Sequence, residues 1–167
     1  MAQLTAPSWF FPEVTGRDLL GHEYRLPTDF PAPLSIAVIA FKQWHQGQVD
    51  QWISRLAERG FPQTPHGRTD LDRVILELPV ISGRYQVARR FIDGGMAASI
   101  RDPEILARTI TIYGSVDRLC EPLGITSRET VSVRVVRRDG TVVWGTTGLV
   151  SEEAVEDLGA ALDTGHS

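Results

Sequence analysis

The fold is decided by residues 34–60, which have the sequence LSIAVIAFKQWHQGQVDQWISRLAERG. The first part, Leu34 to Phe41, is an apolar run rich in isoleucine and valine, as expected for a strand buried on both faces. From Val49 onward the apolar residues recur at helical spacing, and Gly60 supplies a C-terminal stop. The inner stripe of this helix comprises Val49, Trp52, Ile53 and Leu56. The stretch therefore predicts a strand, a short turn and a helix.

Composition and charge are those of an ordinary globular protein. The chain has 167 residues, 42% hydrophobic and 23% charged, which suits one well-buried domain. The formal net charge is −4, so the protein has no overall positive potential that would attract phosphate groups. We therefore expect no nucleic-acid partner. No apolar run approaches the roughly 20 residues that cross a bilayer, so we expect no membrane span. The N-terminus shows no secretory pattern, and with Cys120 as the one cysteine we expect a cytoplasmic location.

The segments on either side of the central stretch carry their own local signals. Val14 to Leu26 predicts a hairpin with its turn near Leu20 and Gly21. Arg73 to Ile81 predicts a strand, and Pro79 within it favours a sheet edge or an early end. The next elements are a helix over about 84–93, a short helix or loop over 102–108 and a strand over 109–113.

The C-terminal third carries helix caps and a hairpin turn. Ser115 is expected to cap a helix that ends at Gly124, and Ser151 to cap the last helix. Between them, Arg138-Asp139-Gly140-Thr141 separates two apolar runs and is the strongest hairpin signal in the chain. The alternation of strands and helices predicts an α/β fold with a mixed central sheet of about five strands, helices on both faces and an N-terminal hairpin. We expect an extended segment over 1–12, one domain over 13–163 and a frayed tail over 164–167.

Three segments resemble the thioredoxin-like superfamily, in its peroxiredoxin-like and thiol-reductase-like branch. They are VIAFKQW followed by a helix, the closing SVRVVRRDGTVVWGTTGLVSEEAVEDL, and the opening VTGRDLLGHEYRLP. The resemblance covers roughly residues 12–163 and implies a thioredoxin-like three-layer fold. The chain is also similar, more weakly, to the thioredoxin-fold assembly factor of the mitochondrial ATP synthase.

The resemblance implies where redox chemistry would be. The family motif Trp-Cys-Gly-Pro-Cys falls on Trp44-His45-Gln46-Gly47-Gln48, so His45 takes the place of the attacking thiol and Gln48 that of the resolving thiol. The family's cis-proline would precede a strand near Val131, where this chain has no proline. We therefore expect no dithiol exchange. The vacated site would be a binding groove lined by Trp44, His45, Gln46 and Gln48, with Arg128, Glu129 and Thr130 opposite.

Each candidate residue also has a structural interpretation. His45 at a helix N-terminus could act as a hydrogen-bond donor or general base, or simply fill the turn. Trp44 could be a ligand platform or a packing residue. Cys120 lies on the apolar face of a predicted helix, where a thiol is inert. Arg84, Arg89 and Arg90 could hold an anion or form a solvated helix face. The histidines lack metal-ligand spacing and no phosphate-binding glycine motif occurs, so we expect neither metal nor cofactor.

The leading hypothesis is a redox-inactive binding, assembly or chaperone-like module with a protein partner, which includes self-association. The alternative is a thiol peroxidase or glutathione-dependent enzyme that uses Cys120 or an external thiol near His45. A third hypothesis, a small-ligand carrier, rests on the aromatic residues Trp9, Phe10 and Phe11.

Overall fold

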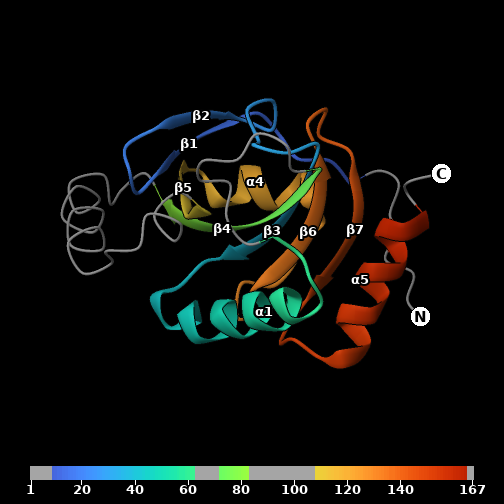
Figure 1. Cartoon of the computed structure of the whole chain (residues 1–167). Coiled ribbons are helices and arrows are strands. Elements are labelled where there is room, and N and C mark those ends of the chain that lie inside the picture. Colours follow the sequence, from blue (N-terminus) through green and yellow to red (C-terminus); the bar gives the residue numbers. More distant parts are fainter. Residues whose placement is uncertain (1–8, 63–71, 83–107, 165–167) are drawn as a thin grey trace.

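The computed structural model describes residues 9–62, 72–82 and 108–164, in which seven strands form one mixed sheet (Figure 1). From one edge to the other the strands are β2 (Glu23–Leu26), β1 (Val14–Asp18), β5 (Ile110–Gly114), β4 (Arg73–Ser82), β3 (Leu34–Ala40), β6 (Ser132–Arg137) and β7 (Val142–Thr147). Two of them are the N-terminal hairpin and the other five form the expected central sheet. The predicted fold class is therefore confirmed.

Residues 34–60 form the expected strand and helix at the centre of the sheet. β3 pairs parallel with β4 and antiparallel with β6, so both of its edges are occupied. The chain then makes one 3-10 turn, η1 (Gln43–His45), and enters α1 (Gln46–Glu58). The four stripe residues of α1 are buried, and Gly60 adopts φ 90° just past its end.

The prediction that Pro79 places β4 at a sheet edge or ends it early is wrong. β4 lies between β3 and β5 and continues to Ser82. Pro79 pairs with Ala40, the last residue of β3, so the missing N–H falls at the end of that ladder. Regular pairing with β5 then starts at Val80.

Both predicted hairpins are present. β1 and β2 join the main sheet because β1 also pairs antiparallel with β5. The β6–β7 turn is built as its sequence indicates, since Gly140 has φ 95° and the Asp139 side chain accepts a hydrogen bond from Thr141 N–H at 2.8 Å.

Helices cover both faces of the sheet (Figure 1). The helices α1 and α5 (Glu152–Thr164) pack on one face, and α4 (Val116–Leu123) packs on the other. Ser115 and Ser151 cap α4 and α5 by accepting backbone N–H bonds, as predicted. No helix in the described parts of the chain is long and apolar enough to cross a membrane.

Part of the prediction lies outside the described residues. This applies to the helix over 84–93 with Arg84, Arg89 and Arg90, to nearly all of the 102–108 segment, and to the frayed tail beyond residue 164.

Candidate functional site

Three segments meet at one end of the sheet. β3 ends at Ala40 and leads through η1 into α1, while β6, which is antiparallel to β3, begins at Ser132 at the same end. Residues 126–131, which we call the facing loop, precede β6. The candidate site is the junction between η1, the first turn of α1 and the facing loop.

His45 lies inside this junction and does not line an open surface. Its side chain is 0% exposed. The Nδ1 atom accepts a hydrogen bond from Phe41 N–H at 3.1 Å, and Nε2 lies 3.1 Å from the carbonyl oxygen of Glu129, to which it donates. Burial lowers the pKa of His45 from its ordinary value, an effect that the Glu129 carbonyl partly opposes. A neutral His45 therefore links the end of β3 to the facing loop.

The two glutamines of the motif point to different partners. Gln48 is half-buried, and its Oε1 accepts a hydrogen bond from Val131 N–H at 3.1 Å. Gln46 is exposed and donates to Asp50 at 3.0 Å and to the buried Glu77 at 3.3 Å. Only Gln48 therefore reaches the facing loop.

Trp44 is the exposed member of the motif. Its side chain is 58% exposed, and its ring meets the His45 ring edge-on with 4.4 Å between the centroids. It covers the buried imidazole on one side and faces solvent on the other.

The facing loop presents its charged side chains outward. Arg128 and Glu129 are exposed, Thr130 is half-buried, and the Arg128 guanidinium pairs with Asp117 on α4. The loop has no cis peptide bond in this structure, whose one cis bond among the described residues joins Leu26 and Pro27.

The predicted groove is bridged by the protein itself. The carbonyl of Glu129 is bound by His45 and the N–H of Val131 by Gln48, so two backbone groups of the facing loop already have partners. An extended peptide could not pair with those groups unless both side chains moved away.

Cys120 is placed as its sequence pattern indicates, on the inner face of α4. Its side chain is 2% exposed among the core residues Leu119 and Leu123. Burial raises the pKa of the Cys120 thiol, although the guanidinium of Arg128 acts in the opposite direction. The thiol is thus both hidden and protonated at neutral pH.

Comparison with known proteins identifies the fold. No protein-family model and no curated protein matches the sequence. Among solved structures, the chain is similar to a putative electron transfer protein from Aquifex aeolicus, with a TM-score of 0.61 and 11% identity over 93% of this chain and 96% of that one. The likeness extends to the exposed lipoprotein thioredoxin of Streptococcus pneumoniae, with a TM-score of 0.55 and 13% identity over 88% of this chain and 97% of that one. The chain has a thioredoxin-like fold.

A third similar structure is BsSco, described as a member of the Sco family of cytochrome c oxidase assembly proteins. Its TM-score is 0.54 and its identity 13%, over 96% of this chain and 98% of that chain. At such identities the likeness concerns the fold, and chemistry has to be argued from the residues themselves.

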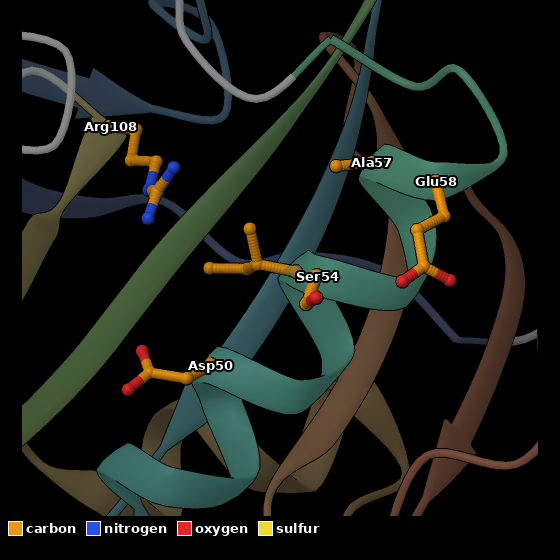
Figure 2. A pocket seen from close by; sticks show the side chains of 6 residues that line it. Asp50, Ser54, Ala57, Glu58 and Arg108 are labelled. Atoms are coloured by element: carbon orange, nitrogen blue, oxygen red, sulfur yellow. The ribbon is translucent and has the colours of Figure 1, made fainter.

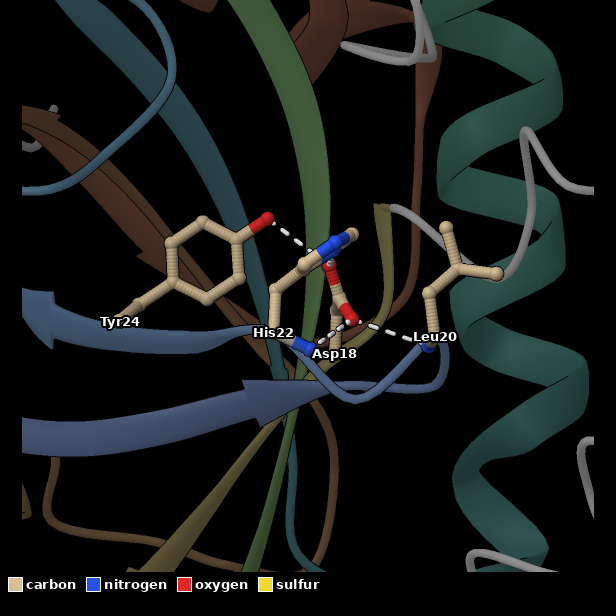
Figure 3. Close-up of polar contacts among 4 residues, drawn as sticks. All are labelled: Asp18, Leu20, His22 and Tyr24. Atoms are coloured by element: carbon tan, nitrogen blue, oxygen red, sulfur yellow. Dashed lines mark hydrogen bonds and ion pairs between the residues drawn. The ribbon is translucent and has the colours of Figure 1, made fainter.

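Away from the junction, the thioredoxin-like fold holds a buried carboxylate that the sequence did not indicate. Asp18 is 3% exposed and accepts four hydrogen bonds within the β1–β2 hairpin (Figure 3). The donors are the N–H groups of Leu20 and His22, the His22 ring and the Tyr24 hydroxyl, at 2.8 to 3.1 Å. Burial first, and then the Asp18 bond, raises the pKa of Tyr24 well above its usual range. This cluster fixes the turn of the hairpin.

A buried ion pair joins β4 to Arg108, two residues before β5. Arg108 donates to Glu77 at 3.1 Å, and both side chains are nearly buried. Arg108 also borders a hollow of about 550 Å³ beside α1, together with Asp50, Ser54 and Glu58 (Figure 2). Within the parts of the chain that the structure describes, no group of three or more His, Cys, Asp or Glu side chains is arranged to hold a metal ion.

Arg134 is another buried charged residue, and it lies within an apolar strand. It is 1% exposed in β6 and donates to the carbonyl oxygens of Leu123, Val133 and Thr146 at 2.9 to 3.0 Å. Burial lowers the pKa of Arg134 to about 10. The Trp9 ring stacks on its guanidinium at 4.5 Å. Gly145 opposite leaves room for the side chain, because a Cβ at that position would lie 2.6 Å from Arg134 Cδ.

Proposed function

We propose that this thioredoxin-like protein works by binding, as an assembly or chaperone-like module or as a scaffold that joins copies of itself, without dithiol exchange. One observation carries the proposal. The two positions that a redox pair would occupy hold His45 and Gln48, and both side chains are engaged in hydrogen bonds to the facing loop. Neither side chain can form a disulfide or accept electrons from a thiol.

The surface over this junction suits contact with a protein. Trp44 and Leu149 are 58% and 61% exposed. Trp44 packs on the His45 ring, and Leu149 follows Gly148, whose N–H bonds to the carbonyl oxygen of Val131 at 2.9 Å. Two large apolar side chains thus flank the facing loop, and exposed large apolar side chains are candidates for contact with a protein.

The comparisons lend an analogy to this proposal. BsSco, with a similar fold, belongs to a family of cytochrome c oxidase assembly proteins. An assembly role on this fold therefore has a precedent, although the partner of this chain has to be inferred from its own surface residues. The net charge of −4 favours a protein partner over nucleic acid. The cytoplasmic location, which rests on the single cysteine, is part of the proposal and is tested by cell fractionation.

The first experiment tests for thiol chemistry. Purified wild type, Cys120→Ser and His45→Ala would be assayed for insulin-disulfide reduction and for peroxide consumption with and without glutathione. We expect no activity in any of the three proteins. Activity that disappears with Cys120→Ser, or a glutathione-dependent activity that disappears with His45→Ala, would overturn the proposal in favour of a thiol enzyme.

The second experiment tests binding at the proposed surface. Wild type, Trp44→Ala and Phe10→Ala would be compared as bait, because Phe10 is 52% exposed and lies elsewhere, bridged to Thr141. We expect a partner that wild type and Phe10→Ala retain and Trp44→Ala loses, with gel filtration reporting self-association in the same three proteins. Capture and self-association that are unchanged in Trp44→Ala would contradict the assignment of this surface.

A further inference from the structure

The two ring nitrogens of His45 have opposite roles that only one form of the imidazole can fill. Phe41 N–H donates to Nδ1, which must therefore be an unprotonated acceptor, and Nε2 donates to the carbonyl of Glu129. The neutral ring with its proton on Nε2 satisfies both bonds. A proton added at Nδ1 would place two donors face to face and end the bond to Phe41.

This pair of bonds joins segments that are far apart in the sequence. Phe41 directly follows β3, and Glu129 lies in the facing loop, 84 residues beyond His45. The neighbouring bond from Val131 to Gln48 does not depend on protonation, since an amide side chain does not titrate. An added proton therefore ends the bond between Phe41 and His45, while Nε2–H still donates to Glu129 and Val131 remains held by Gln48.

The charged groups around His45 have opposing effects on its protonation. Lys42, next to η1, disfavours the imidazolium and Glu129 in the facing loop favours it, while burial is the largest effect and disfavours it. The guanidinium of Arg128 forms an ion pair with Asp117 on α4. On α1, Asp50 accepts a hydrogen bond from Gln46. At the start of α5, Glu152 pairs with Arg55.

We propose that His45 is an acid-sensitive latch, whose protonation releases the Phe41 N–H at the end of β3 while the bond to Glu129 and the seven-stranded sheet stay in place. The sheet keeps its ladders because no strand-to-strand bond passes through His45. α1 stays in place through its buried stripe of Val49, Trp52, Ile53 and Leu56. The latch opens below the ordinary histidine pKa of about 6.5, because burial favours the neutral ring. It is a property of the fold and holds whether or not the junction binds a partner.

The test uses Trp44 as a reporter, because its ring lies 4.4 Å from the His45 ring and an imidazolium quenches indole fluorescence. Fluorescence and far-UV circular dichroism of wild type, Trp44→Phe, His45→Gln and His22→Gln would be followed from about pH 8 to about pH 4.5, a range that spans the ordinary histidine pKa. We expect a fluorescence step in wild type and in His22→Gln that is absent in Trp44→Phe and His45→Gln, with unchanged circular dichroism.

Amide hydrogen exchange of wild type provides the second readout and does not require any variant to fold. Across the step, the Phe41 amide should lose protection while the Val131 amide, held by Gln48, keeps it. The latch is ruled out if the fluorescence changes only together with circular dichroism, if the step persists in His45→Gln, or if Phe41 and the β3 amides lose protection together.

Discussion

The imidazole of His45, at the N-terminus of α1, is bound to the carbonyl oxygen of Glu129, 84 residues further along the chain. Together with the bond from the Val131 N–H to Gln48, this contact joins the two segments that would be the walls of a thioredoxin-like groove. The two bonds therefore form a structural joint between these segments.

The joint should contribute measurably to stability. In His45→Ala, the N–H of Phe41 and the carbonyl of Glu129 both lose a buried partner. Because an unsatisfied buried backbone group costs about 1–3 kcal/mol, we expect a loss of about 3 kcal/mol in the free energy of unfolding. Urea denaturation measures it, with Trp44→Ala as the matched control on the neighbouring exposed side chain. Equal stability of wild type and His45→Ala would mean that the two bonds contribute nothing net.

Gly145 should resist enlargement because Arg134 lies against it. Replacing a strand glycine with alanine usually stabilises by about 0.4–1 kcal/mol where the backbone permits it. Here the new Cβ would lie 2.6 Å from Arg134 Cδ, so we expect Gly145→Ala to destabilise by about 2 kcal/mol. The effect should shrink in an Arg134→Ala background, which a double-mutant cycle measures. Gly159→Ala, whose Cβ would meet nothing within 4 Å, is the control.

Cys120 should react with thiol reagents only when the fold opens. Its side chain is 2% exposed and burial raises the pKa of the thiol, so the reactive thiolate is rare and hidden. An opening free energy of about 2.7 kcal/mol would slow the reaction about 100-fold relative to unfolded protein. Labelling with a maleimide in the presence and absence of urea gives this ratio, and equally fast labelling of folded protein would show the thiol to be accessible.

Asp18 and Tyr24 should make stability depend on alkaline pH. The pKa of Tyr24 is raised in the folded protein, chiefly by burial and then by the bond to Asp18. A raised folded pKa gives stability that is complete below the unfolded value of about 10 and is lost as pH rises above it. Asp18→Asn should lower stability at neutral pH by about 2 kcal/mol, because four bonds to a charged acceptor are weakened.

Asp18→Asn should also reduce the loss of stability at alkaline pH, because the tyrosinate formed there would no longer face a carboxylate. Denaturation curves at about pH 8 and about pH 10.5, which bracket the ordinary tyrosine pKa, compare the two proteins. Glu23→Gln serves as the control because Glu23 is exposed and paired only with Arg17 among the described contacts. If the loss of stability between the two pH values is unchanged in Asp18→Asn, the raised pKa of Tyr24 does not depend on Asp18.

The elements that the sequence predicted correctly are those defined by local signals. The strand and helix over 34–60 follow from a change of apolar period, and the β6–β7 hairpin follows from Asp139 and Gly140. Helix caps at Ser115 and Ser151 are equally local. Each signal lies within a few residues of the structure that it determines.

The errors and omissions concern relations between distant residues. Pro79 indicated an edge strand, but strand order depends on which segments pair, and Pro79 falls where the β3 ladder ends. His45 was expected on the wall of a groove, whereas its burial depends on a loop 84 residues away.

The buried charges were hidden for a related reason. Glu77 and Arg134 lie inside apolar strands, where a single charged residue is usually interpreted as facing solvent. A clue to Arg134 was available in Gly145, since a glycine inside a strand often marks the close approach of another group. The burial of Asp18 was missed although its four donors lie within six residues of it, because they come together only once the hairpin has formed.

The stack of Trp9, Arg134 and Gly145 also bears on how relatives of this chain could be recognised. The arginine occupies the space that a side chain at position 145 would need, and the indole covers its guanidinium. A lineage that gains a side chain at 145 should therefore lose the arginine at 134, and one that loses the arginine has no further need of an aromatic residue at 9. Joint variation of these three positions, the first of which lies more than a hundred residues from the other two, would be an evolutionary signature of this particular form of the fold.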